Sequence, residues 1–446
     1  MRWIAIMLLG CAWCGTLLAE EPSAERGKKA LLETSFNPAV WTQTAYKNAW
    51  KRWDGGKEAP EDYAKAFEEH YGLHPAPFPN NELPMGLRQS QGLLGKGISS
   101  DCLVCHGGSI MGKSYVGLGN TALDFQALWE DMSAAEGGPA KTPFTFCNVR
   151  GTSEAGSMAV YLLSHREPNL NLRLKAVDLE IHADMCEDVP AWWHLKKKRT
   201  MYYDGGADAR SVRSIMQFMM SPLNPASAFE KSEPAFRDIQ AYLLSLEPPK
   251  YPLPVDDKLA SKGLETFEQT CSRCHGTYGK KPTYPNRIIP LEEIGTDPKR
   301  AQGLSEKFSK YYNQSWFAKE KPGWYADEYT AKASEGYQAP PLDGIWATAP
   351  YFHNGSAPTV YHVLNSKARP KIFTRSYHTD RDAYDAEKLG WKIQVLDKPP
   401  DEKLPDIEKR KIYDTSQPGR ANTGHTFGDK LSDDERMAVI EYLKTL

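Results

Sequence analysis

The chain has 446 residues, of which 25% are charged and 40% are hydrophobic. It is too long for one small domain and too apolar for a disordered chain, so we expect two or three packed domains. With 55 Lys and Arg against 57 Asp and Glu the formal net charge is −2, and long basic tracts are absent. This balance argues against nucleic acid as a partner.

The N-terminus has the pattern of a secretory signal peptide. Arg2 is followed by an apolar run, and Leu17-Leu18-Ala19 precedes Glu20. We therefore predict a signal peptide over residues 1–19 and a mature protein in the periplasm or outside the cell. Lipidation at Cys11 is the less favoured alternative. No later segment has the roughly 18 to 20 apolar residues of a membrane span.

Two C-x-x-C-H motifs carry most of the chemical information. Their members are Cys102, Cys105, His106, Cys271, Cys274 and His275. Two thiols at this spacing reach the two vinyl groups of one haem, and the adjacent His becomes the proximal iron ligand. The alternatives are a thioredoxin-like dithiol and a four-Cys zinc site, neither of which requires the trailing His twice. The motifs therefore predict two covalently bound haem c groups, with His106 and His275 as iron ligands.

Cys147 and Cys186 remain outside these motifs once the predicted signal peptide is removed. An even remainder in an oxidising compartment favours a disulfide between them. Two buried free thiols are the alternative.

The chain also repeats itself. Residues 239–246 match residues 439–446 at an offset of 200, and each segment has the pattern of an amphipathic helix that closes a domain. A capping box, Ser432 with Glu435, precedes the second helix. The Pro-rich segment 248–256 cannot continue the first helix and is predicted to be a stiff linker.

The linker divides the chain into an N-terminal domain, residues 20–247, and a C-terminal domain, residues 257–446. Just after it, Gly263, Phe267 and Cys271 follow at four-residue steps, as in a helix that leads into a haem motif.

A second repeat supports the same division. The spacing from Pro190 to Gly205 equals that from Pro340 to Gly355. The sequence thus predicts a mainly α protein of two cytochrome c-like haem domains with long irregular loops.

Three segments carry a resemblance to a known family. The run 339–356 resembles the signature of the bacterial dihaem cytochrome c peroxidase superfamily, and segments 116–124 and 422–428 resemble its rubber oxygenase branch. The resemblance implies an exported dihaem oxidoreductase. In such a protein the C-terminal haem relays electrons and the N-terminal haem activates dioxygen or peroxide.

The sixth ligand of the C-terminal haem is predicted to be a histidine. The only Met after Met220 is Met437, which belongs to the packing face of the last helix. The histidines available in this half are His353, His362, His378 and His425. The resemblance favours His425 opposite His275, and it implies that His353 lies near the haem without binding iron.

No spacing identifies a distal ligand for the N-terminal haem. The candidates are Met111, Tyr115, His165, His182 and His194. The resemblance implies an open or weakly held position. The peroxidases place a Glu and a Gln after their Asp-Gly-Arg turn, whereas segment 210–215 after Asp204-Gly205 has neither. Ordinary peroxidase chemistry is therefore not favoured.

Two aromatic and basic features have open interpretations. Trp192, Trp193 and Trp346 are candidates for positions near the haems, with core packing as the alternative. The run Lys196–Arg199 either holds haem propionates, docks an acidic partner, or is a solvated face.

The leading function is a haem oxidoreductase that acts on a small-molecule or hydrophobic organic substrate with dioxygen or peroxide. An electron-donor protein is the expected source of its electrons. The alternative is a non-catalytic electron-transfer cytochrome with two six-coordinate haems.

Overall fold

The computed structural model describes residues 20–53, 56–92, 95–139, 141–142, 144–320 and 328–446. The predicted signal peptide, residues 1–19, lies outside the described residues. Among the residues that are described, no helix is both long and apolar enough to cross a membrane.

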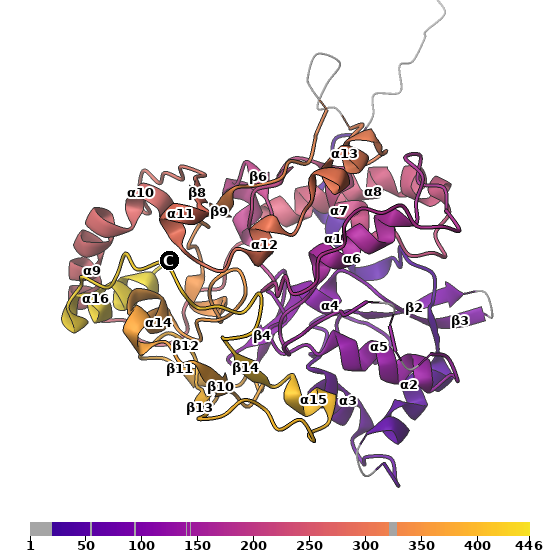
Figure 1. Cartoon of the computed structure of the whole chain (residues 1–446), viewed down its shortest axis with the longest axis horizontal. Coiled ribbons are helices and arrows are strands. Elements are labelled where there is room, and N and C mark those ends of the chain that lie inside the picture. The colour runs from indigo at the N-terminus through magenta and orange to yellow at the C-terminus, as the bar shows by residue number, and fades with distance from the viewer. Residues whose placement is uncertain (1–19, 54–55, 93–94, 140, 143, 321–327) are drawn as a thin grey trace, which may run out of the picture.

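Helices are the longest regular elements (Figure 1). The α-helices are α1 (Ala24–Glu33), α2 (Gln43–Asn48), α3 (Tyr63–Tyr71), α4 (Leu103–His106), α5 (Phe125–Ala134), α6 (Ala155–Ser164), α7 (Val212–Ile215), α8 (Ala226–Ser245), α9 (Asp257–Thr270), α10 (Ser272–His275), α11 (Leu291–Ile294), α12 (Lys299–Gln302), α13 (Glu306–Gln314), α14 (Val360–Leu364), α15 (Asp406–Lys409) and α16 (Asp433–Leu443). Short 3₁₀ helices are η1 (Ala49–Arg52), η2 (Trp192–Lys197), η3 (Met216–Met219), η4 (Ile345–Ala347) and η5 (Ser366–Ala368).

The strands of the described residues form small sheets of two or three strands. They are β1 (Trp41–Thr42), β2 (Leu87–Gly92), β3 (Gly95–Ser100), β4 (Gly107–Ile110), β5 (Lys113–Val116), β6 (Thr200–Met201), β7 (Ala207–Asp208), β8 (Ile288–Pro290), β9 (Gly336–Gln338), β10 (Ile372–Thr374), β11 (Tyr384–Asp385), β12 (Gly390–Trp391), β13 (Gln394–Val395) and β14 (Ile412–Asp414). The orders β1-β3-β2 and β13-β10-β14 are antiparallel. Between these elements run long loops.

The helices predicted to close each half are present. α8 contains residues 239–245, and α16 begins after Ser432 with both hydrogen bonds of the capping box. The two predicted helices and the capping box are thus confirmed. The segment between α8 and α9, which includes the Pro-rich stretch, has neither helix nor strand.

In each half, the last helix crosses the first helix of that half at a glycine. A Cβ on Gly263 of α9 would lie 1.9 Å from the carbonyl oxygen of Ala438 in α16. In the same way, a Cβ on Gly27 of α1 would lie 1.8 Å from the carbonyl oxygen of Asp238 in α8. Only glycine permits backbones to approach so closely. The pair α1 and α8 is therefore the counterpart of α9 and α16, which the sequence analysis did not find for α1.

The second sequence repeat is also a repeat of backbone conformation. Gly205 and Gly355 have φ of 67° and 71°, and the residues three positions before them, Tyr202 and Phe352, have φ of 68° and 70°. A bulky non-glycine residue with positive φ is uncommon, so the same rare turn at the same position supports the repeat.

The two repeated segments contact each other reciprocally. The backbone N–H of Asp188 donates to the carbonyl of His353 at 2.7 Å, and the N–H of Gln338 donates to the carbonyl of Tyr203, also at 2.7 Å. Since residues 188 and 203 correspond to 338 and 353 in the repeat, each half makes the same contact with the other. This is the pattern of a local two-fold axis.

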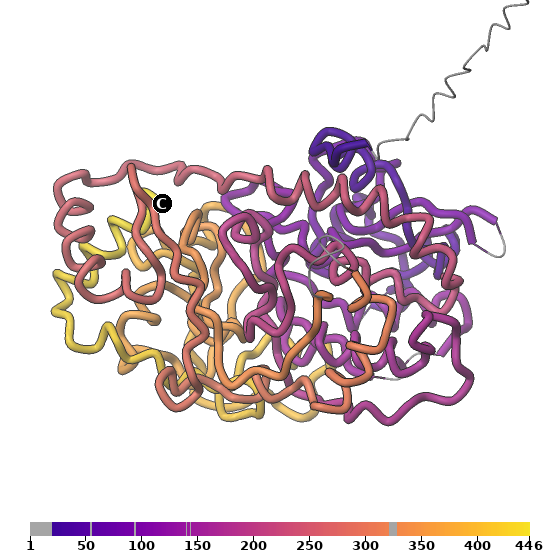
Figure 2. Tube along the Cα trace, turned by 90° about the horizontal axis from the view of Figure 1, so that it is seen from above, coloured from indigo at the N-terminus to yellow at the C-terminus, as the bar shows by residue number. Residues whose placement is uncertain are grey.

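A segment of the C-terminal half that contains α12 (Lys299–Gln302) and α13 (Glu306–Gln314) packs against the N-terminal half. α12 and α13 lie beside α7 and α8, away from α9 and α16 (Figure 1), and the orange part of the tube reaches the indigo and magenta side in Figure 2. Phe308 and Tyr312 of α13 pack in one apolar cluster with Phe236 and Leu243 of α8. On α12, the buried Arg300 is ion-paired to Glu187 and Asp204 of the N-terminal half.

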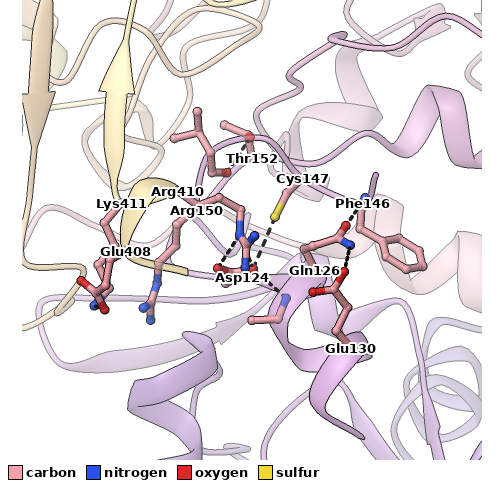
Figure 3. A network of polar contacts seen from close by, with 12 residues as sticks. Asp124, Gln126, Glu130, Phe146, Cys147, Arg150, Thr152, Glu408, Arg410 and Lys411 are labelled. Carbon is pink, nitrogen blue, oxygen red and sulfur yellow. Dashed lines mark hydrogen bonds and ion pairs between the residues drawn. The ribbon is translucent and has the colours of Figure 1, made fainter. Parts of the chain in front are cut away.

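A second buried ion pair, between Asp124 and Arg410, also joins the two halves. Asp124, which is 0% exposed, accepts hydrogen bonds from Arg410 at 2.8 and 3.0 Å and from the backbone N–H of Ala127 at 2.9 Å (Figure 3). It is thus both the N-cap of α5 and the counter-ion of a cation that comes from the end of α15. The backbone N–H of Arg150 adds a bond of 2.8 Å to the carbonyl of Arg410.

We expect Asp124→Ala to lower the free energy of unfolding by about 3–5 kcal/mol, because it leaves the Arg410 guanidinium buried without a counter-charge. The matched control is Asp62→Ala, which removes only the exposed N-cap of α3 and should cost about 1 kcal/mol. Urea denaturation of the holoprotein measures both. Equal losses in the two variants would contradict the assignment of Asp124 as the buried link.

Candidate functional site

Both C-x-x-C-H motifs line one large cavity. Its volume is about 1160 Å³, and its walls include all six motif residues together with many apolar side chains from both halves. Pockets for a single small ligand are commonly about 300–1,000 Å³. Because protein interiors are close-packed, an apolar space of this size requires a bulky occupant.

The two motif histidines are oriented in related ways. Nδ1 of His275 donates to the carbonyl of Pro340 at 2.9 Å, which leaves Nε2 as the nitrogen with a free lone pair. The carbonyl of Pro190 faces His106 and raises its pKa against the larger effect of burial, although Nδ1 makes no hydrogen bond of ordinary geometry. Pro190 and Pro340 are the first residues of the repeat, so the equivalent carbonyl faces the motif histidine in each half.

His425 faces His275 across the C-terminal part of the cavity. Their ring centres lie 6.3 Å apart. Two imidazoles on opposite sides of one metal ion, with metal–nitrogen bonds of about 2.0 Å and about 1.1 Å from each nitrogen to its ring centre, would be about 6.2 Å apart. Burial lowers the pKa of His275, and it lowers that of His425 to about 4 with help from the charges of His275 and Arg369. Both rings are therefore neutral, as iron coordination requires.

These residues fit a haem. The pair His275 and His425 would hold the iron of such a group with two imidazole nitrogens, and the C-x-x-C thiols would attach its ring. No group of three or more His, Cys, Asp or Glu side chains that could hold a bare metal ion exists among the described residues. Burial raises the pKa of Cys105 and Cys271 to about 12, so both thiols stay protonated at neutral pH.

The N-terminal part of the cavity differs, since among the residues that the structure describes the ring contact of His106 is with Trp192 and not with a second histidine. Trp192 stacks on His106 with ring centres 4.7 Å apart and planes 24° apart. Of the five distal candidates only His194 lines the cavity, and its Nε2 donates to the carbonyl of Asp343 at 2.8 Å. The candidates that do not line it are Met111, Tyr115, His165 and His182.

Several polar side chains on this wall were missed by the sequence analysis. Gln217 lies two residues beyond segment 210–215, lines the cavity, and donates from Nε2 to the hydroxyl oxygen of Tyr202 at 3.0 Å. A search of the sequence extended by one helical turn would have included it. Burial raises the pKa of Glu154, another lining residue, to about 7. Met158 and Met201 also line the cavity and carry thioether sulfurs.

The remaining candidates divide between cavity and core. His353 lines the cavity, stacks on Tyr337 with ring centres 4.0 Å apart, and has a buried Nε2 without a partner. Trp193 donates to the carbonyl of Asp343 at 2.9 Å. Trp346 does not line the cavity, because it packs in the C-terminal core and donates to the carbonyl of Pro249 at 2.8 Å.

The expected disulfide between Cys147 and Cys186 is not formed, and this prediction needs correction. Both cysteines are free and buried. The thiol of Cys147 donates to Asp124 at 3.6 Å, whereas the sulfur of Cys186 lies 3.9 Å from the hydroxyl oxygen of Tyr413. Each sulfur thus has its own polar partner, so the alternative of two buried thiols applies.

Comparison with known proteins supports a cytochrome relationship for part of the chain. Residues 336–374 match a family model described as RoxA-like, cytochrome c-like. This match covers η4 and the second copy of the repeat, which is a small part of the chain. It supports a dihaem cytochrome c peroxidase-like relationship for one domain.

Two uncharacterised proteins of Sinorhizobium fredii (strain NBRC 101917 / NGR234) are similar to the chain. Protein y4iJ is 32% identical over 262 residues, which cover 45% of this chain and 41% of that protein. Protein y4iM is 30% identical over 298 residues, which cover 58% of this chain and 64% of that protein. The chain therefore spans less than two thirds of the length of either relative.

Among solved structures, a MauG-like protein associated with microbial copper homeostasis is similar with a TM-score of 0.28 and 14% sequence identity, over 66% of this chain and 89% of that one. A likeness at this level does not define the fold.

His425→Ala is expected to change the visible spectrum of one haem from low-spin to high-spin and to create a new carbon monoxide site, because the iron opposite His275 loses its second nitrogen. The control is His362→Ala, since His362 is buried but lies outside the cavity wall, where its Nδ1 bonds to the hydroxyl of Thr359 at 2.8 Å. A low-spin spectrum that persists in His425→Ala would refute this ligand assignment.

Proposed function

We propose that this chain is an exported c-type cytochrome oxidoreductase with two covalently attached haems, built from two cytochrome c-like domains. The observation that carries the proposal is the shared cavity, into which both Cys-x-x-Cys-His motifs open. Further support comes from the paired helix crossings at Gly27 and Gly263 and from the repeated turn at Gly205 and Gly355.

The C-terminal site is proposed to relay electrons. His275 and His425 face each other, so together they would hold an iron with two protein nitrogens and would leave no position on it for a substrate. A ligand set that stays the same in both oxidation states suits electron transfer.

The N-terminal site is proposed to carry the chemistry. A haem held by Cys102, Cys105 and His106 supplies an iron that can bind and activate dioxygen or peroxide. On the wall of this site the Gln217 amide is held by the hydroxyl of Tyr202, which orients its N–H groups. Glu154, with a pKa of about 7, holds or releases a proton near neutral pH.

The substrate proposed is a hydrophobic organic molecule. Phe125, Trp129 and Phe146 line the cavity, and their rings contact one another with Phe125–Phe146 and Trp129–Phe146 centres 4.7 and 5.2 Å apart. An aromatic wall favours an apolar ligand and excludes water from it. Electrons would come from a donor protein.

A second candidate function is electron transfer without catalysis, and one observation favours it. Met158 and Met201 line the cavity, and a thioether is a common axial ligand of c-type haems. If either sulfur filled the sixth position, both haems would be six-coordinate.

We expect two haems per chain in a pyridine haemochrome assay of the purified protein, because each motif supplies two thioether bonds. Replacing Cys102 and Cys105 by Ala should leave one covalent haem per chain. Replacing Cys147 by Ala, a buried cysteine outside the motifs, is the control and should leave two. One haem in the wild-type protein would overturn the two-site proposal.

Carbon monoxide should bind one of the two haems of the reduced protein, and oxygen uptake should accompany oxidation of an apolar alkene such as polyisoprene or a carotenoid under air. Turnover of peroxide with an artificial donor should be slow. Fast peroxide turnover without oxygen uptake would reverse the preference for dioxygen. If carbon monoxide does not bind and neither assay responds, the protein is an electron carrier, and Met158→Leu and Met201→Leu then identify the ligand by restoring carbon monoxide binding.

A further inference from the structure

Three neighbouring lysines follow Trp192, and the structure gives two of them ordinary partners. Nζ of Lys196 pairs with the exposed Glu247 at 2.6 Å. Nζ of Lys197 donates to both carboxylate oxygens of Asp343 at 2.6 and 2.8 Å. These two side chains are surface and inter-half ion pairs, which explains their charge completely.

Lys198 is different. It lines the cavity, and among the described residues no carboxylate lies within ion-pair distance of its Nζ. The polar contact of Nζ is the carbonyl oxygen of Tyr202 at 3.4 Å. Burial lowers the pKa of Lys198 to about 8, and the more distant charge of Asp204 opposes this effect. Lys198 is half-buried, and an ammonium inside a largely apolar cavity without a bonded counter-ion is costly, so an anion beside it would be stabilising.

The repeat places Lys198 at a position that faces the cavity in both halves. Its equivalent at the same spacing is Thr348, which also lines the cavity. Lys198 also follows directly on η2, whose first residue, Trp192, stacks on the ring of His106. Lys198, Trp192 and His106 therefore all line the same cavity.

We propose that Lys198 is the counter-ion of a carboxylate of the N-terminal haem. The proposal rests on the haem sites argued above. A haem is an apolar ring that carries two carboxylates, and these must be neutralised or solvated when the ring is buried. Lys198 offers a cation inside the cavity, while Thr348 offers the corresponding site only a hydroxyl. The two haems thus differ in the charge next to them.

Lys198→Met, which keeps the length of the side chain and removes the charge, should lower the reduction potential of one haem, because a cation near the carboxylate disfavours the ferric state. We expect at least a tenfold change in the ratio of reduced to oxidised iron at a fixed potential, which is about 59 mV for a one-electron couple. The potential of the other haem should stay unchanged. Spectroelectrochemical titration of the holoprotein resolves the two.

Lys196→Met is the matched control, since it removes a neighbouring charge whose partner is exposed, and it should leave both potentials unchanged. Lys198→Arg should retain the wild-type potentials. If Lys198→Met does not fold, Lys198→Gln serves the same purpose. The proposal is overturned if the neutral variant at 198 keeps both potentials, or if Lys196→Met gives the same shift. Two covalent haems with unchanged potentials reject Lys198 alone, whereas absence of haem from the wild-type protein rejects the proposed function.

Discussion

The reciprocal contact between the two repeated segments is the constraint on which the arrangement of the molecule depends. Two backbone hydrogen bonds, from Asp188 to His353 and from Gln338 to Tyr203, hold the two turns against each other. One partner in each bond, Asp188 or Gln338, lies two residues before the proline whose carbonyl faces a motif histidine, Pro190 or Pro340. Fixing the turns therefore fixes the two histidines relative to each other and makes one cavity from two halves.

That cavity in turn couples folding to its occupant. The folded chain without a ligand would enclose about 1160 Å³ beneath walls that are mostly apolar, and the cost of such a space grows with its volume. A group that fills it stabilises the folded state by all the contacts that it makes. The buried ion pairs of Asp124 with Arg410 and of Arg300 with Glu187 and Asp204 then hold the halves around the occupant.

The sequence was most informative where chemistry is local. The C-x-x-C-H motifs, the helix at 239–245 and the capping box at Ser432 each depend on neighbouring residues, so spacing alone predicted them. The position of His425 opposite His275 depends on contacts between distant segments, and it followed only from resemblance to a family.

Three other features depend on packing between distant segments, which the spacing of residues in the sequence does not predict. α1 lies far from the first haem motif in the sequence. Its crossing with α8 at Gly27 is what identifies it as the counterpart of α9 in the N-terminal half. Cysteine counting paired Cys147 with Cys186, but each thiol found a separate hydrogen-bond partner. The sequence does not distinguish the three lysines at 196–198 from one another. In the structure two of them form ion pairs, and the third lines the cavity.

The repeat also explains how one backbone design supports two different sites. Asp188, Lys198 and Asp204 of the N-terminal half are ionisable, whereas the equivalent residues of the C-terminal half are neutral: Gln338, Thr348 and Asn354. Neutral amides and hydroxyls keep their charge during electron transfer, which would suit the proposed relay site between His275 and His425. Ionisable groups respond to charge that develops on a neighbouring ligand, and they supply protons or counter-charge where bonds are broken. Under the proposed function, the same turn, copied twice, would become part of a relay on one side of the local two-fold axis and part of a reaction site on the other through these substitutions.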